Sequence, residues 1–118
     1  MVPRRKTRVP PPVCPIATCM RVIGGAWTPQ VVWYLRDDPR RFSELKSDLA
    51  GVSAKTLSAR LRKLEGDGVV RREVKPTSPP TVEYQLTPLG ARLIPAVEAI
   101  VEVGNELKRR RLTGHPRL

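Results

Sequence analysis

The sequence has few of the residues that build catalytic or metal-binding sites. Its only histidine, His115, lies in a polar segment, with no second histidine and no cluster of Asp, Glu or Cys at ligand spacing. The chain also lacks a nucleophile paired with a base, a glycine-rich phosphate loop and the paired carboxylates of acid–base catalysis. These absences argue against an enzyme and against a metal site, and no cofactor is expected.

Long apolar runs are missing as well, so no segment is expected to span a bilayer. The N-terminus is basic, but Pro10, Pro11 and Pro12 stand where a signal peptide would have its apolar region. The two cysteines, Cys14 and Cys19, are too few and too close in sequence for a disulfide framework. A cytoplasmic protein is therefore expected.

Positive charge, by contrast, is abundant. The 118 residues include 22 Lys and Arg but 11 Asp and Glu, which gives a formal net charge of +11. A chain of this length is expected to form one domain with a small hydrophobic core. Its charge favours a polyanionic partner, either a nucleic acid or an anionic membrane surface.

The two ends of the chain differ from its middle. Residues 1–13 contain four prolines and four basic residues without apolar periodicity, which predicts a disordered basic arm. Residues 113–118 are predicted to be a disordered tail, so the folded domain is expected to span residues 14–112.

Within that domain, hydrophobic periodicity and cap residues predict five helices and one β-hairpin. Thr28, Ser43, Ser53 and Thr87 are the expected N-caps, and Pro95 is expected to bend the last helix near its start. The helices are expected over residues 15–23, 28–35, 43–49, 53–65 and 87–110, and the strands over residues 69–75 and 82–86.

The segment from Phe42 to Thr87 joins a short helix, a three-residue turn at Ala50–Val52, a helix rich in Lys and Arg, and the hairpin. This order is that of the winged helix-turn-helix, which places its second helix in the DNA major groove. The predicted fold class is α+β, mainly α: a winged helix-turn-helix with an extra N-terminal helix and a long C-terminal dimerisation helix.

The helix over residues 53–65 is predicted to have an apolar and a basic face. Ala54, Leu57, Leu61 and Leu64 form the predicted core stripe. The N-terminal residues of the opposite face are expected to meet base edges, and the later basic residues are expected to bind phosphates. The residues predicted to contact DNA are Ser43, Ser53, Lys55, Thr56, Ala59, Arg60, Arg62, Lys63 and Lys75.

A simpler interpretation is that any exposed helix in a basic protein collects Lys and Arg. A non-specific architectural or RNA-binding protein would also account for the charge. The turn, the core stripe and the hairpin together favour double-stranded DNA as the partner, rather than a membrane.

The last predicted helix carries an apolar pattern suited to a second helix. Leu93, Val97, Ile100, Gly104 and Leu107 recur at alternating spacings of four and three, which predicts a helix–helix seam. Trp27, Trp33 and Tyr34 are candidates to line an effector pocket, but aromatic residues on an apolar helix more often belong to the core.

Several short segments occur in an order and at a spacing that resemble a known family. They are Cys14–Pro15, Ile23–Thr28, Arg41–Leu45, Lys55–Ser58, Leu61–Glu65, Gly68–Val70, Pro79–Pro80 with Val82–Tyr84, and Leu86–Gly90. Over about residues 14–107 the chain resembles the HxlR-type transcriptional regulators, a branch of the MarR-like winged-helix proteins.

The resemblance implies a homodimer, built from the first helix with Ile16 and Met20 and from the last helix, that binds pseudo-palindromic operators as a repressor or activator. It also implies a response to oxidants, quinones or aldehydes, although the effector itself is not identified. Cys14 matches the redox-sensing thiol of some members; the alternative is a small buried residue that packs the first helix. Ala26 and Thr81 replace basic residues that are usual in the family.

Overall fold

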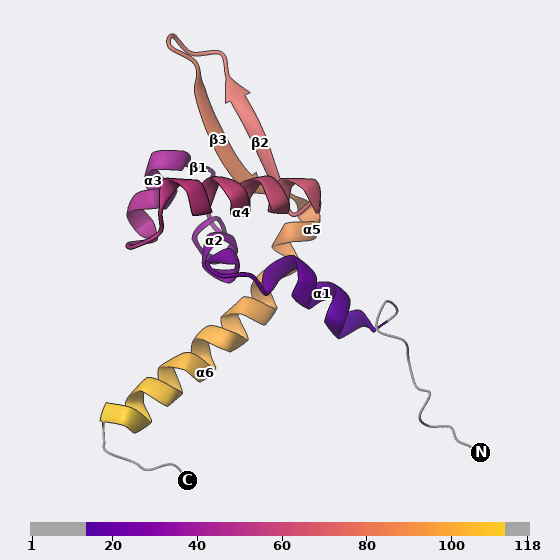
Figure 1. Ribbon diagram of the computed structural model, residues 1–118, viewed down its shortest axis with the longest axis vertical. Helices are drawn as coiled ribbons and strands as arrows, with labels where there is room; N and C mark the ends of the chain where they lie inside the picture. The colour runs from indigo at the N-terminus through magenta and orange to yellow at the C-terminus, as the bar shows by residue number, and fades with distance from the viewer. Residues whose placement is uncertain (1–13, 113–118) are drawn as a thin grey trace, which may run out of the picture.

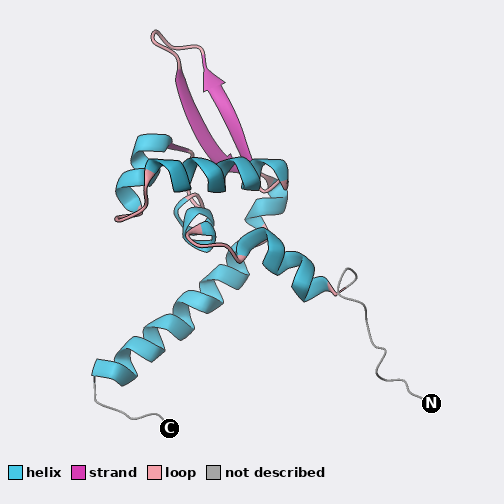
Figure 2. Ribbon diagram, viewed as in Figure 1, coloured by secondary structure: helices cyan, strands magenta, loops and turns pink. Residues whose placement is uncertain are grey.

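The computed structural model describes residues 14–112, so the predicted arm over residues 1–13 and the predicted tail over residues 113–118 lie outside the described part. Helices surround one end of a projecting hairpin (Figures 1 and 2). The elements are α1 (Pro15–Ile23), α2 (Thr28–Tyr34), β1 (Arg40–Arg41), α3 (Phe42–Asp48), α4 (Ala54–Gly66), β2 (Val70–Lys75), β3 (Thr81–Leu86), α5 (Pro88–Ala91) and α6 (Ile94–Leu112).

The predicted winged helix-turn-helix is confirmed. α3 and α4 form the helix-turn-helix, and Gly51 in the turn between them has φ of 100°, a conformation that glycine adopts without steric cost. β2, β3 and the loop over residues 76–80 form the wing, with Val70 opposite Leu86 and Lys75 opposite Thr81. In Figure 1 the wing projects from one side of the helices, and α6 extends from the other.

The sheet has a third strand that the sequence pattern did not predict. β1 is two residues long and pairs with β3, so the strand order is β1-β3-β2. Arg40 lies opposite Tyr84 and Arg41 opposite Glu83. Two residues are too few to show the alternation by which a strand is recognised in a sequence.

The hydrophobic core lies where α2, α3, α4 and the start of the wing meet. Leu57, Leu61 and Leu64 of α4 are each 1 % exposed or less, as the predicted stripe requires, but Ala54 is exposed at the start of the helix. The other core residues are Val31, Val32, Leu35, Leu45, Leu49, Val52, Val69, Val70 and Val97.

Two of the four predicted N-caps are confirmed. The hydroxyl oxygens of Ser53 and Thr87 accept the backbone N–H groups of Thr56 and Gly90, each at 3.0 Å. These bonds satisfy donors that the first turn of a helix leaves without partners.

The other two caps were predicted wrongly. Thr28 is a buried first residue of α2, and Trp27 before it takes the left-handed conformation with φ of 71°. Ser43 lies inside the first turn of α3, whose N-terminus begins after Arg41. The Arg41 N–H donates to the carboxylate of Glu44 at 2.8 Å, so a glutamate three residues on satisfies the donor instead of a serine.

The last predicted helix is two helices. α5 ends at Ala91 and α6 begins at Ile94, so Pro95 lies in the first turn of α6, where its missing N–H leaves no hydrogen bond unmade. At the other end of α6, hydrogen bonds from Arg109 and then Arg110 lower the pKa of the Glu106 carboxyl. α6 is the longest helix of residues 14–112, and neither it nor any other in that range is apolar over the length that a bilayer requires.

Candidate nucleic-acid interface

The outward side of α4 is the surface that the sequence predicted to meet DNA. Because the three leucines turn inward, Lys55 and Arg62 face solvent, and Thr56 and Ala59 are half-buried beside them. The side chain of Lys55 makes no hydrogen bond or ion pair with any residue in 14–112, so its ammonium is available to a ligand. The Ser53 hydroxyl bonds to both the N–H and the hydroxyl of Thr56, which makes Ser53 primarily a helix cap.

Two of the predicted phosphate-binding residues lie on the flank of α4 that faces α1, and both are already bonded within the chain. The Arg60 Nε donates to the carbonyl oxygen of Ala26 at 2.7 Å. The Lys63 Nζ donates to the carbonyl oxygen of Arg21 at 2.7 Å and to the carboxylate of Asp67 at 2.9 Å. These side chains tie α4 to the end of α1 and to the loop that follows it.

The opposite flank of α4 faces the wing, and the positive side chains there make fewer hydrogen bonds within the described residues. Arg62 donates to the hydroxyl of Ser58 at 2.7 Å. Arg72 of β2 lies opposite Tyr84, and its side chain makes no hydrogen bond or ion pair within the described residues. Arg72 is not among the residues that the sequence predicted to contact DNA. Its position between Val70 and Val74, on the inner face of an alternating strand, was the available signal.

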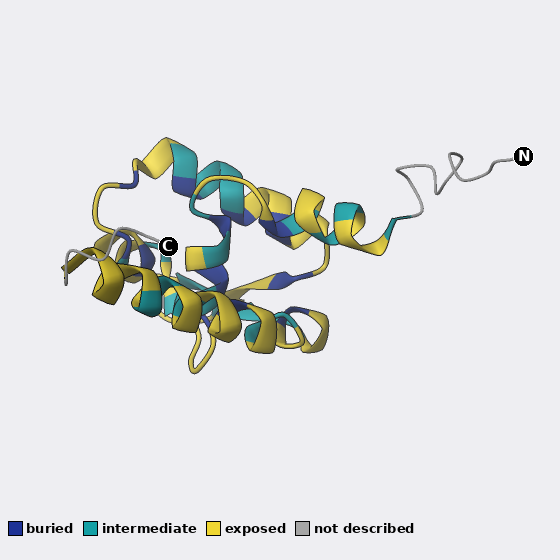
Figure 3. Cartoon of the chain, turned by 90° about the horizontal axis from the view of Figure 1, so that it is seen from below, coloured by how far each residue is buried: buried dark blue, intermediate teal, exposed yellow. Residues whose placement is uncertain are grey.

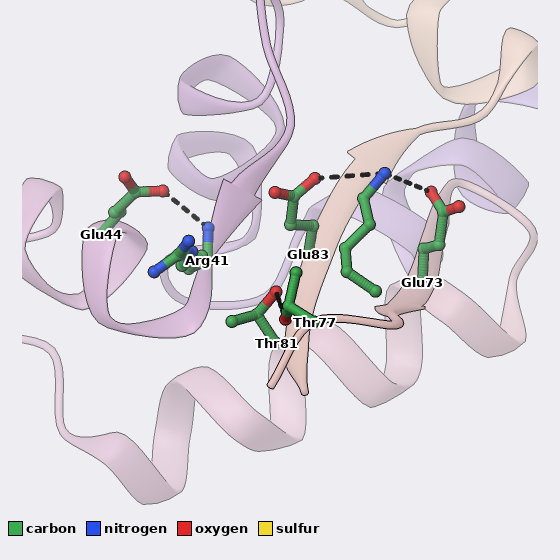
Figure 4. A network of polar contacts seen from close by, with 7 residues as sticks. Arg41, Glu44, Glu73, Thr77, Thr81 and Glu83 are labelled. Atoms are coloured by element: carbon green, nitrogen blue, oxygen red, sulfur yellow. Dashed lines mark hydrogen bonds and ion pairs between the residues drawn. The ribbon is translucent and has the colours of Figure 1, made fainter. Parts of the chain in front are cut away.

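Lys75 of the wing, which the sequence predicted to contact DNA, is paired with two carboxylates of the chain. Its ammonium lies 3.6 Å from a carboxylate oxygen of Glu73 and 3.9 Å from one of Glu83. The two glutamates face each other across β2 and β3, as Figure 4 shows, and like charges in directly opposed positions destabilise a sheet. Lys75 therefore neutralises a pair of wing carboxylates.

Cys14 lies at the N-cap position of α1, is half-buried and forms no disulfide, and Cys19 is likewise a free, half-buried thiol. The backbone carbonyl of Cys14 accepts the N–H and the hydroxyl of Thr18. Within residues 14–112, no three side chains of His, Cys, Asp or Glu are placed to hold a metal ion.

The predicted dimer residues divide into two groups. Val97 is 3 % exposed and Leu93 packs against the same core, so these two side chains stabilise the chain itself. Ile100 and Leu107 on α6 and Ile16 and Met20 on α1 are exposed by half or more. Val103, which the predicted seam omitted, is exposed in the same way, and Gly104 is half-buried. Most residues in the outer part of α1 are exposed, as the yellow segments of that helix in Figure 3 show.

Trp33 lies at the edge of the core and not in its interior. It lines an apolar groove of about 290 Å³ between α2 and α6, and the guanidinium of Arg36 lies 3.7 Å from the centre of one of its rings. The residues lining this groove are Pro29, Gln30, Trp33, Val97, Ile100 and Val101.

Comparison with known proteins agrees with this architecture. The family model described as HxlR-like helix-turn-helix matches residues 22–111. The uncharacterized HTH-type transcriptional regulator BH0655 of Halalkalibacterium halodurans is 41% identical over 91 residues, which cover 76% of this chain and 80% of that protein. The chain belongs to the HxlR family.

Solved structures of related proteins have the same fold. The oxidized form of the redox regulator HypR superposes with a TM-score of 0.76 at 38% identity, covering 79% of this chain and 96% of that one. A MarR-family regulator from Porphyromonas gingivalis W83 gives a TM-score of 0.79 at 33% identity, covering 84% and 97%. This HxlR-family chain is thus a transcriptional regulator of the helix-turn-helix type and not an enzyme.

Proposed function

We propose that this HxlR-family regulator binds a specific DNA sequence as a homodimer, with α4 of each subunit in a major groove. The observation that carries the proposal is the division of α4 into a buried leucine stripe and a solvent-facing side with Lys55 and Arg62. The N-terminal part of such a helix meets base edges, so Lys55, Thr56 and Ala59 are the candidates for sequence recognition. Arg62 and Ser43 are assigned to phosphates, which add affinity but little sequence information.

Selection of bound sequences from random duplex DNA tests this proposal. Enrichment of a pseudo-palindrome with half-sites about 10 bp apart is expected, because two α4 helices related by a two-fold axis enter successive major grooves. Binding to the selected duplex is expected to exceed binding to random duplex by roughly 10³-fold at physiological salt. If random duplex displaces the selected duplex equally well, the protein is a non-specific binder and the proposal is wrong.

A second role, regulation through Cys14, is supported by the position of that thiol. Cys14 is free and half-buried at the start of α1, next to the exposed apolar side chains assigned to the dimer. The related HypR is a redox regulator. Oxidation of the Cys14 thiol would place a polar or bulkier group at the subunit boundary.

Treatment with diamide or hydrogen peroxide tests this role. The affinity of the wild-type protein for the selected duplex is expected to change, and a reducing agent is expected to restore it. Cys14→Ser should remove the response, whereas Cys19→Ser, which removes the other thiol of α1, should keep it. A wild-type affinity that is insensitive to both oxidants contradicts the role of Cys14.

A further inference from the structure

A polar pocket of about 330 Å³ lies between α4 and the adjoining strands of the wing. Its lining residues come from three elements, α4, β2 and β3, and are Ser58, Leu61, Arg62, Glu65, Arg72 and Tyr84. Leu61 is 1 % exposed and forms a fixed base, since it belongs to the core. The two arginines approach the pocket from different elements, one from the helix and one from the strand.

The hydrogen-bonding capacity of these arginines is mostly unused. A guanidinium has five N–H donors in a planar fork that matches phosphate oxygens. The structure gives one hydrogen bond to Arg62, from its guanidinium to the Ser58 hydroxyl, and none to Arg72 among residues 14–112. Glu65 makes no ion pair with either arginine within that range. The pocket therefore carries one net positive charge and many free donors.

The position of the pocket matches the geometry of a helix in a major groove. Ser58, Arg62 and Glu65 follow one another at helical spacings of four and three, so they share one flank of α4, adjacent to the DNA-facing side with Lys55. A helix in the major groove has a phosphate backbone on each flank. On the α1 flank the cations are bonded internally, whereas on the wing flank the two arginines are available.

We propose that this pocket binds one phosphodiester of the DNA backbone, with Arg62 and Arg72 both donating to its oxygens. A phosphodiester carries a single negative charge, which balances the net charge of the pocket. Arg72 then fixes the distance of the backbone from the wing, and α4 fixes its register. The inference rests on the proposed function, because it takes α4 as the helix that enters the groove.

A scan of the selected duplex with single methylphosphonates, which are uncharged, tests the assignment. One position in each half-site is expected to weaken binding of the wild-type protein by about tenfold, the value of a charge-assisted hydrogen bond. Arg62→Ala and Arg72→Ala should each weaken binding to the unmodified duplex about as much. Each single variant should then be less sensitive than the wild type to the methylphosphonate at that position, and the double variant should be insensitive to it.

Arg71→Ala provides the matched control. It removes the same charge from the neighbouring residue of β2, whose side chain lies on the other face of the sheet opposite Gln85. This variant should remain as sensitive to the critical methylphosphonate as the wild type. If urea unfolding shows that Arg72→Ala is not folded, Arg72→Gln, which keeps the length of the stem, replaces it.

Different results of these experiments would contradict the phosphodiester pocket and the proposed function. If Arg72→Ala keeps the wild-type sensitivity at every methylphosphonate position, or if the double variant remains as sensitive as the wild type at the critical position, the shared phosphodiester is wrong while sequence-specific binding stands. If the wild type does not distinguish the selected duplex from random duplex, the proposed function itself fails.

Discussion

Gly90 is a residue at which two backbone segments nearly touch. A Cβ built on Gly90 would lie 2.1 Å from the backbone carbonyl oxygen of Val69. The approach is held by Thr87, whose hydroxyl donates to the carbonyl of Gly68 at 2.6 Å and whose N–H donates to that of Val69 at 3.0 Å. The Thr-Pro-Leu-Gly segment thus joins α5 to the start of the wing and fixes where β3 ends.

Gly90→Ala is accordingly expected to lower the free energy of unfolding by at least about 1–3 kcal/mol, because a backbone carbonyl cannot move away as a side chain can. Urea unfolding followed by circular dichroism measures the change. Gly66→Ala is the control: apart from its chain neighbours and the backbone of its own helix, no atom lies within 4 Å of its added Cβ, so the stability of this variant should equal or slightly exceed that of the wild type. A Gly90→Ala variant as stable as Gly66→Ala would contradict the close approach.

Lys75 and Lys55 carry the same charge but have different surroundings. Lys75 bridges two wing carboxylates, whereas Lys55 has no partner among the described residues. We expect Lys55→Ala to reduce the slope of log K against log[salt] for the selected duplex by about one. Lys75→Ala should leave that slope unchanged and lower the free energy of unfolding by less than about 1 kcal/mol, since the pair is partly exposed. Equal slopes for the two variants would contradict this distinction.

At the scale of elements, α4 is held from both sides. Lys63 and Arg60 join it to backbone carbonyls at the end of α1 and in the next loop, and its leucines rest on the core. Cys14 lies at the N-cap of α1, and Lys63 bonds to the carbonyl of Arg21 near the other end of the same helix. The wing flank, with Arg62, has no such link to α1.

Lys63→Met and Arg62→Met remove equal charges from adjacent positions on different flanks. Lys63→Met should lower the free energy of unfolding by about 1 kcal/mol, because the Arg21 carbonyl loses its partner. Its salt slope for DNA should match that of the wild type. Arg62→Met should leave the free energy of unfolding unchanged and reduce the slope of log K against log[salt] by about one. Chemical unfolding gives the change in stability, and binding titrations at several salt concentrations give the salt slope. If Lys63→Met reduces the slope and Arg62→Met lowers the stability, Lys63 binds the phosphate and Arg62 has the structural role.

The sequence was sufficient for the elements that have a repeating pattern. The stripe of three leucines predicted the buried face of α4, and hydrophobic periodicity predicted the two strands of the wing. The sequence could not show which cations of α4 are bonded within the chain and which are available to DNA. Arg60 and Lys63 bond to backbone carbonyls 34 and 42 residues away in the sequence. Because every residue has a backbone carbonyl, the sequence pattern does not indicate which one accepts such a bond.

At the scale of the whole molecule, several large apolar side chains of the first and last helices are exposed. Ile16 on α1 is 74 % exposed, and Ile100, Val103 and Leu107 on α6 are 53–59 % exposed. The three α6 side chains lie at spacings of three and four, on one face of the helix. We assign this apolar face of α6 to the contact between the subunits of the proposed dimer, because exposed apolar patches commonly mark protein–protein contacts.

Ile100→Asp is therefore expected to convert the proposed dimer into a monomer, because it would bury an unpaired carboxylate in the apolar contact. Asn105→Asp is the control: it adds the same charge, but residue 105 lies on the opposite side of α6. Sedimentation velocity should give a monomer for Ile100→Asp and a dimer for Asn105→Asp and the wild type. The monomer should also bind the selected duplex far more weakly, because two half-sites engaged together raise the affinity beyond that of either one. A dimeric Ile100→Asp protein would place the subunit contact on another surface.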